Sequence, residues 1–154
     1  MWAMYNFGKI SIICVGGLKE DFLRGAQAEF VKRLTPYGKF VIIELPQGNT
    51  PPDDAPKILK ALSNGSHKIA MAIDGKKFTS EGFAAHLEGL ATSGCSHLEF
   101  IIGGSTGLCG SVLAVCNARI SMSEMTFTHQ LARIILLEQI YRACRILNNQ
   151  PYHK

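Results

Sequence analysis

The chain contains, at residues 98–107, the stretch LEFIIGGSTG, in which an apolar run ends directly in a glycine cluster. A short apolar run bounded by turn residues is typical of a buried strand. In sheets of parallel strands, ligands bind beyond the carboxyl ends of the strands, and glycines there let a ligand approach the backbone. The glycines do not form the dinucleotide fingerprint G-x-G-x-x-G, and no Lys followed by Ser or Thr completes a phosphate loop. The cluster is therefore either a tight turn or part of a binding site.

On both sides of this stretch, short apolar runs alternate with longer segments of helical period. This alternation predicts an α/β domain with a mainly parallel sheet and helices on both faces. Strands are expected at residues 10–15, 40–45, 68–73, 98–102 and 119–122. Helices are expected at residues 20–34, 57–63, 80–90 with Ser80 as N-cap, 111–117 and 131–147. Residues 46–56 hold four prolines and are expected to form a loop.

The composition favours one folded domain over residues 1–154. Of the 154 residues, 47% are hydrophobic, which is enough to build a core. The five cysteines include no Cys-x-x-Cys pair, which argues for reduced thiols and against a disulfide framework or a zinc site. No span approaches the ~20 apolar residues of a membrane helix. The N-terminal stretch also lacks the basic region of a signal peptide, so we expect a cytoplasmic protein. From the cysteine pattern we expect no bound metal.

The positive charge is concentrated near the C-terminus. The chain has a formal net charge of +4. Residues 119–154 contribute +3 of it, because they hold five Lys or Arg residues and two Glu residues. An arginine-rich segment suits a polyanionic partner. The alternative is a solvated helix face on which Glu138 pairs with Arg142, and the charge alone favours this alternative.

Two further segments are candidates for a site. The hydroxyl-rich residues 121–130 could offer backbone N–H and C=O groups to an adenine ring, or they could simply cap the following helix. The last helix is expected to project Arg133, Arg142 and Arg145, and the tail adds PYHK at 151–154. Aromatic and basic groups together suit a splayed RNA base, although chain ends are usually frayed. Histidines 67, 86 and 97 are expected to be scattered surface residues.

The combination of FIIGGSTGL (100–108), SMSEMTFTHQLARIILLEQIYRA (121–143) and PYHK (151–154) resembles the signature of the RlmH family. Members of this family are SPOUT-class methyltransferases of 23S ribosomal RNA. VGGLKEDF (15–22), KRLTPYGK (32–39) and IELP (43–46) extend the resemblance over the whole chain. It implies a SPOUT domain with a C-terminal deep trefoil knot, a homodimer, and S-adenosyl-L-methionine bound in the knot. It also implies methylation of a pseudouridine at N3 in the assembled ribosome.

The resemblance also implies roles for single residues. The expected cofactor contacts are Ile73, Gly103, Met122, Ser123, Glu124, Met125, Thr126 and Phe127. The expected RNA contacts are His129, Arg133, Arg142 and Lys154. The expected catalytic residues are Arg142, Tyr152 and His153, with His153 as base and Arg142 as stabilising cation. Two positions depart from the family: Thr106 stands where an acidic residue is usual, and Thr128 stands where a proline is usual.

Two other functions are compatible with the residues. A Rossmann-like nucleotide-binding enzyme would use the glycine cluster as its phosphate turn and Glu124 as its ribose partner. A non-catalytic RNA-binding or ribosome-associated protein would keep the fold and the basic edge without binding a methyl donor.

Overall fold

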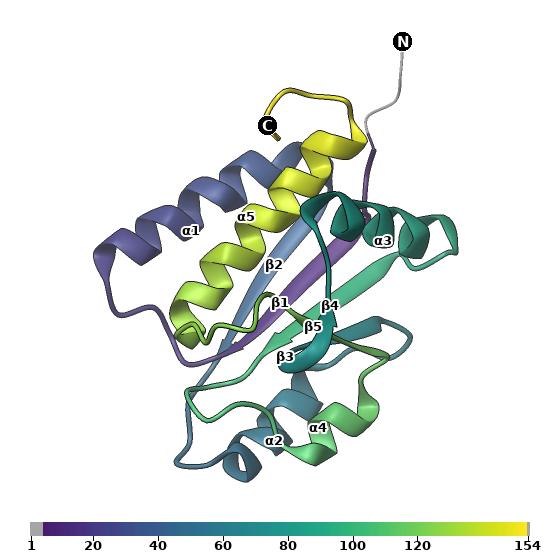
Figure 1. The fold of residues 1–154 in the computed structure, drawn as a ribbon. Helices are drawn as coiled ribbons and strands as arrows, with labels where there is room; N and C mark the ends of the chain where they lie inside the picture. Colours follow the sequence, from purple (N-terminus) through teal and green to yellow (C-terminus); the bar gives the residue numbers. More distant parts are fainter. Residues whose placement is uncertain (1–4, 154) are drawn as a thin grey trace.

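The computed structural model describes residues 5–153, in which helices and strands alternate along the chain (Figure 1). The strands are β1 (Lys9–Val15), β2 (Lys39–Leu45), β3 (His67–Lys77), β4 (His97–Ile102) and β5 (Ala118–Ser121). The helices are α1 (Asp21–Leu34), α2 (Pro51–Ala61), α3 (Ser80–Thr92), α4 (Gly110–Val115) and α5 (His129–Leu147), with a short 3-10 helix at Thr35–Tyr37. In this described part, no helix is long and apolar enough to cross a bilayer.

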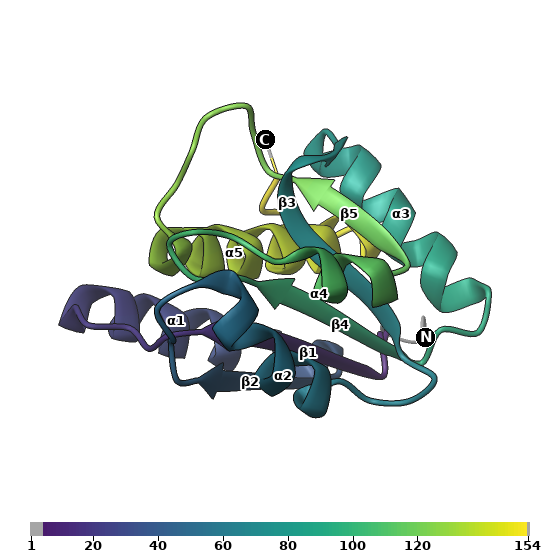
Figure 2. The ribbon, with the colours of Figure 1, turned by 90° about the horizontal axis from the view of Figure 1, so that it is seen from below.

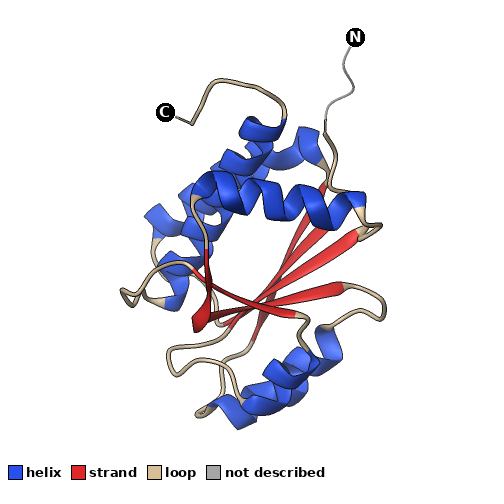
Figure 3. Ribbon diagram, turned by 45° about the vertical axis from the view of Figure 1, so that its right-hand side comes forward, coloured by secondary structure: helices blue, strands red, loops and turns tan. Residues whose placement is uncertain are grey.

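All neighbouring strands are parallel, and the sheet order is β2-β1-β4-β3-β5. Helices α1, α3 and α5 cover one face of the sheet, and α2 and α4 cover the other (Figures 1 and 3). The predicted α/β class with helices on both faces is therefore confirmed.

The central strands are apolar because both of their faces are buried. In β1, Ile10 and Ile12 belong to the larger core cluster under α3 and α5, whereas Val15 belongs to the smaller one under α2 and α4. A strand covered on both faces has a continuous apolar run rather than an alternating one. This explains why the runs could be located from the sequence.

The five cysteines are free in the structure, and none is bonded to another. Cys14 and Cys144 are buried in the larger core cluster. Burial raises the pKa of each thiol to about 12, so both behave as small apolar side chains at neutral pH.

The loop predicted at residues 46–56 is wrong in its second half, because α2 begins at Pro51. Pro51 and Pro52 occupy the first turn, where a missing N–H breaks no helical hydrogen bond. The following acids accept the amides before the helix: Asp53 from Thr50 at 3.1 Å and Asp54 from Gly48 at 2.6 Å. The cluster of prolines and acids therefore starts a helix rather than preventing one.

Helix α3 is capped one residue earlier than predicted. Thr79, not Ser80, is the N-cap, and its hydroxyl oxygen accepts the Gly82 N–H at 3.0 Å. Ser80 is the first helical residue, and its hydroxyl is free to bond α5 instead.

Strand β3 is longer than the predicted 68–73 and crosses β5 (Figure 2). Met71 and Lys76 are both in register with Ile120, and the intervening residues leave the ladder. A Cβ atom on Gly75 would lie 2.6 Å from the backbone N and C atoms of Ile120, so only glycine allows this approach. The crossing brings the end of β3 beside the segment that follows β5.

Candidate functional site

A cavity of about 580 Å³ lies beyond the carboxyl end of β4. The glycine turn that follows β4 lines one part of it through Gly103, Gly104 and Gly107, and the segment before α5 lines another through residues 126–130. Two candidates that are far apart in the sequence therefore face the same cavity.

The glycine turn is tight, and its backbone is close-packed. A Cβ atom on Gly103 would lie 2.6 Å from the carbonyl oxygen of Gly107. Gly107 has a φ of +88° and donates its N–H to the carbonyl of Gly104 at 3.0 Å. The cluster is thus both a tight turn and a wall of the cavity, so the two alternatives do not exclude each other.

A second cavity of about 150 Å³ is lined by residues of the same loop. Met71, Thr126 and Phe127 line both cavities. Ile73 and Met125, which also line the second cavity, are 62% and 74% exposed, an unusual state for large apolar side chains. These residues offer apolar walls that the protein itself does not cover.

The backbone of this loop has unused donors. Ser123 accepts the Met125 N–H at 3.0 Å and thereby turns the chain. The backbone N–H groups of Thr126 and Phe127 donate no hydrogen bond to any atom of residues 5–153. Backbone donors beside apolar walls suit a planar heterocycle with ring nitrogens.

Glu124 lies outside both cavities, unlike the other residues expected to contact the cofactor. Its side chain is 84% exposed and forms an ion pair with Lys77 of β3 at 2.7 Å. This pair ties the loop after β5 to the end of β3.

The three expected catalytic residues come together where the tail folds back onto α5. The Arg142 guanidinium lies 4.8 Å from the centre of the Tyr152 ring, and its Nη1 lies 3.2 Å from His153 Nδ1. Glu138 Oε1 accepts from Arg142 Nη2 at 2.6 Å and from the Tyr152 hydroxyl at 3.0 Å. Burial, followed by the bond to Glu138, raises the pKa of Tyr152, so it remains a neutral phenol.

The tail is docked rather than frayed. Arg145 Nη2 donates to the carbonyl of Pro151 at 2.9 Å, and the Tyr37 hydroxyl donates to Gln150 at 2.5 Å. Arg145, expected to project from the helix, instead fixes the turn that returns the tail to α5.

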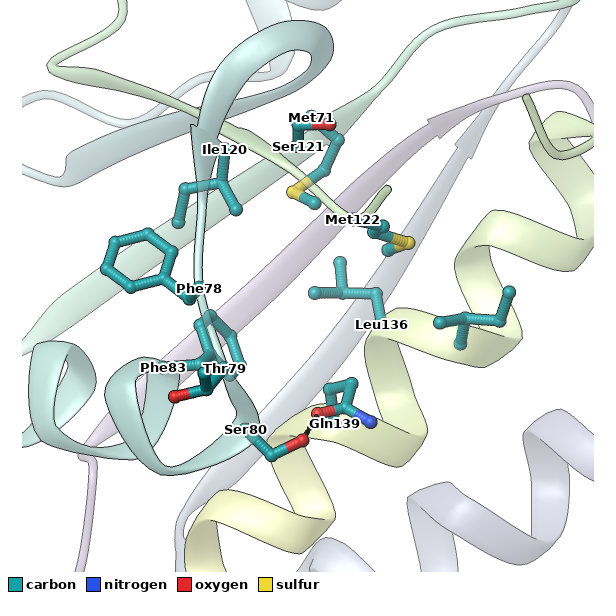
Figure 4. A pocket seen from close by; sticks show the side chains of 11 residues that line it. Met71, Phe78, Thr79, Ser80, Phe83, Ile120, Ser121, Met122, Leu136 and Gln139 are labelled. Atoms are coloured by element: carbon teal, nitrogen blue, oxygen red, sulfur yellow. Dashed lines mark hydrogen bonds between the residues drawn. The ribbon is translucent and has the colours of Figure 1, made fainter. Parts of the chain in front are cut away.

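A third cavity of about 200 Å³ is lined by the first turn of α3, by α5 and by β5 (Figure 4). Phe78, Phe83 and Leu136 form much of its apolar wall. At its rim the Ser80 hydroxyl donates to Gln139 Oε1 at 2.8 Å.

The family model described as a predicted SPOUT methyltransferase matches residues 9–153. The chain belongs to the SPOUT methyltransferase family. The Rossmann-like enzyme considered as an alternative is therefore wrong.

Curated relatives of this SPOUT methyltransferase are named ribosomal RNA large subunit methyltransferase H. The protein from Bacillus thuringiensis (strain Al Hakam) is 45% identical, and the match covers 94% of this chain and 99% of the relative. The protein from Bacillus cytotoxicus is 46% identical with the same coverage. The resemblance to the RlmH family is confirmed.

Solved structures share the SPOUT fold at low identity. A probable methyltransferase from Bordetella pertussis Tohama I aligns with a TM-score of 0.58 at 12% identity, covering 90% of this chain and 95% of that chain. A probable methylase family protein from Haemophilus influenzae Rd KW20 aligns with a TM-score of 0.55 at 13% identity, covering 97% of this chain and 71% of that chain.

In this SPOUT methyltransferase, Arg133 does not project into solvent. It is 1% exposed, and its guanidinium donates to the Gly16 carbonyl at 2.8 Å, to Glu44 at 2.5 Å and to Gln27 at 3.1 Å. The expectation that Arg133 contacts RNA is therefore corrected to a structural role, because its charge is already bound by the protein. Lys154, another expected RNA contact, lies outside the described residues.

His129 lies at the first turn of α5 and lines the cavity beside the glycine turn. Burial lowers its pKa, and the nearby charges of Arg133 and Lys19 lower it further. The ring is therefore neutral at pH 7. Thr128, at the position where the RlmH resemblance implies a proline, caps α5 by accepting the Leu131 N–H at 3.2 Å. A proline side chain has no oxygen for this bond.

The prediction that His67, His86 and His97 are scattered surface residues is wrong. All three are half-buried, and burial lowers the pKa of each. His97 Nε2 bonds Ser11 at 2.9 Å, and within the described residues the Nε2 atoms of His67 and His86 are buried without a partner. That part of the chain holds no group of three or more His, Cys, Asp or Glu residues placed to bind a metal ion.

Sequence reasoning missed Glu81, and it treated Glu138 only as a solvated partner of Arg142. Glu81 Oε1 lies 2.5 Å from His153 Nε2, although 72 residues separate them. The four-residue spacing of Glu138 and Arg142 was visible in the sequence. Nothing local in the sequence connects Glu81 with the tail.

Proposed function

We propose that this SPOUT methyltransferase transfers a methyl group from S-adenosyl-L-methionine to N3 of a pseudouridine in 23S rRNA. We further propose that it acts as a cytoplasmic homodimer, late, on assembled ribosomes. What carries the proposal is the 45% identity over 94% of the chain to proteins named ribosomal RNA large subunit methyltransferase H. The two cavities around residues 122–130 supply a matching site.

The residues around the cavities fit the proposed cofactor. The unbonded N–H groups of Thr126 and Phe127 would donate to the adenine ring, and Ile73 and Met125 would cover its faces. Gly103 would shape the wall of the cofactor cavity, because its lack of a Cβ lets the turn close on the backbone of Gly107. When bound there, the sulfonium group supplies an electrophilic methyl carbon to the RNA base.

The crossing of β3 over β5 supports the proposed knot. A knotted chain must pass one segment through a loop formed by another. The close approach of Gly75 to Ile120 is the kind of crossing that such a passage requires.

The tail cluster supplies the chemistry that methylation at N3 requires. The N3 proton must leave, and negative charge develops on the neighbouring carbonyl oxygens. His153 can accept the proton, and Arg142, only 3.2 Å away, can stabilise the charge. Tyr152 adds an aromatic surface for the base.

The separation of the two parts along α5 supports the homodimer. His129 at the cofactor cavity and Arg142 at the tail cluster are thirteen residues apart, about 20 Å at the helical rise. A single pyrimidine ring is far shorter than this distance. A complete site would therefore combine the cofactor cavity of one protomer with the tail of its partner.

Two inactive variants should complement each other. His153→Ala should lose methyl transfer to ribosomes and keep its affinity for S-adenosyl-L-methionine, measured by calorimetry. Gly103→Ala should lose that affinity, because its Cβ would meet the Gly107 carbonyl. Mixed as refolded dimers in equal amounts, they should recover about a quarter of wild-type activity, since half of the dimers are mixed and each holds one complete site.

Three results would contradict the proposal. If the mixture recovers no activity while both variants dimerise, the shared site is wrong. If the wild-type protein binds ribosomes but not S-adenosyl-L-methionine, the protein is a non-catalytic factor. If a monomeric form modifies short free RNA efficiently, neither the dimer nor the assembled ribosome is needed for specificity.

A further inference from the structure

The first turn of α3 reaches the catalytic tail through two consecutive residues. Ser80 donates to Gln139, and the Gln139 amide donates to Glu138 Oε2 at 2.8 Å. Glu81 lies 2.5 Å from the His153 ring. Helix α3 therefore contacts His153 directly through Glu81 and reaches Glu138 only through Gln139 of α5.

Donor and acceptor chemistry fixes the proton on the His153 ring. A guanidinium can only donate hydrogen bonds, so the 3.2 Å contact with Arg142 Nη1 requires that His153 Nδ1 accept. In the neutral ring, the hydrogen is then on Nε2. That nitrogen faces Glu81 Oε1, and the carboxylate accepts its hydrogen.

We propose that Glu81 is the positioning residue of the catalytic tail: it holds His153 in the Nε2–H tautomer, with the Nδ1 lone pair beside Arg142. This deepens the proposed function and rests on it. The arrangement is the one by which a carboxylate orients a histidine base, with the roles of the two ring nitrogens fixed by the hydrogen bond that one of them makes.

The neighbouring positions of Nδ1 and Arg142 match two neighbouring groups of the proposed substrate, the N3–H group and a carbonyl oxygen beside it. In pseudouridine, N3–H lies between two carbonyl groups. When the base is bound, Arg142 Nη1 turns its N–H from Nδ1 to the adjacent carbonyl oxygen of the base, and the freed Nδ1 lone pair takes the N3 proton as charge develops on that oxygen. The electron pair left on N3 would form the new N–C bond to the methyl carbon, and the methyl C–S bond would break with its electron pair going to sulfur, which leaves as a neutral thioether.

If Glu81 only stabilised the fold, its removal would lower the free energy of unfolding and would leave the tautomer of His153 unchanged. Its side chain is 62% exposed, and that of His153 is 29% exposed. Exposed ion pairs add little to folding stability, so the protein should fold without the Glu81 carboxylate. Removing the carboxylate should instead lower kcat and change the tautomer of the His153 ring.

The test compares Glu81→Ala and Glu81→Gln with Glu88→Ala. Glu88 is an exposed glutamate of the same helix, and within residues 5–153 its carboxylate makes no hydrogen bond. The measurements are kcat and KM for ribosomes, cofactor affinity by calorimetry, and long-range ¹H–¹⁵N spectra of the histidine rings above pH 7. The His153 signal is assigned by its loss in His153→Gln.

In the wild-type protein, the ¹H–¹⁵N spectrum of the His153 ring should show the signals of a neutral ring with its hydrogen on Nε2. In Glu81→Ala only the longer 3.2 Å contact with Arg142 still favours the Nε2–H tautomer, so the ring should give a mixture of tautomers and kcat should fall by about tenfold to a hundredfold, with KM and cofactor affinity unchanged. Glu81→Gln keeps an acceptor oxygen, so it should keep the tautomer and lose less activity. Glu88→Ala should match the wild type.

A wild-type tautomer and kcat in Glu81→Ala would overturn the proposal, as would an equal loss in Glu88→Ala. The ring spectra do not depend on methyl transfer. If the wild-type protein methylates no substrate, the proposed function is wrong. If the wild-type ring gives the Nε2–H pattern and Glu81→Ala changes it, the spectra still support the positioning of His153 by Glu81.

Discussion

At the scale of single residues, Arg133 joins α5 to the ends of two strands. Its guanidinium bonds the Gly16 carbonyl after β1 and Glu44 in β2. Removing it leaves these acceptors without their donor. Arg133→Met should lower the free energy of unfolding by about 2 kcal/mol, because the Gly16 carbonyl loses its donor, whereas the Glu44 side chain is 46% exposed and can bond water. Urea denaturation measures the change.

The matched control is Arg119→Met, because Arg119 forms an exposed pair with Asp74. An exposed pair contributes about 0–1 kcal/mol. If Arg133→Met unfolds at the wild-type urea concentration and instead weakens RNA binding, Arg133 is an RNA contact after all.

The residues of the candidate site differ in how far the sequence could reveal them. Gly103 and Thr126 were found because a glycine after a strand and a hydroxyl-rich loop before a helix are local signals. Arg133 was misplaced, because a helical period cannot distinguish a buried, bonded arginine from a projecting one. Glu81 was missed, because its partner is brought near only by the folded tail.

At the scale of secondary-structure elements, the crossing of β3 and β5 depends on Gly75. Gly75→Ala should destabilise the protein and weaken binding of S-adenosyl-L-methionine, because the added Cβ would overlap the backbone of Ile120. Gly89→Ala is the control: it lies in α3 with nothing within 4 Å of the added atom. It should stabilise the protein by about 0.5–1 kcal/mol.

Thermal melts and calorimetry measure both substitutions. If Gly75→Ala melts with the wild type and binds the cofactor equally well, the close crossing is not needed for the site.

Most elements could be located from the sequence, because buried strands and one-sided helices have distinct periods. Two element boundaries were predicted wrongly. Asp53 and Asp54 accept amides and begin α2 in a segment that looked like a loop. The end of β3 was missed because Asp74 and Gly75 look like a turn, although the strand continues past them to cross β5.

At the scale of the whole molecule, four histidines make folding sensitive to mild acid. Burial, the largest cause in each case, lowers the pKa of His67, His86, His97 and His129. The unfolded chain, with histidine pKa values near 6.5, therefore takes up protons first as the pH falls. Their contribution to stability is present above about pH 6.5 and is lost below it.

The urea midpoint should therefore be lower at pH 5.5 than at pH 7.5. His86→Phe should reduce the difference, because His86 already packs against the Phe78 ring at 5.0 Å and its Nε2 has no partner among the described residues. Equal midpoints at the two pH values would contradict this account.

The strand order constrains how the chain can fold during its own synthesis. Strand β1 can pair with β2 as soon as both have been made, but both neighbours of β3 in the sheet, β4 and β5, follow it in the sequence. A nascent chain therefore carries β3 unpaired until residues 97–102 have emerged. Helix α5, which covers the larger core cluster, comes later still. Folding of the core must therefore wait until α5 has been synthesised.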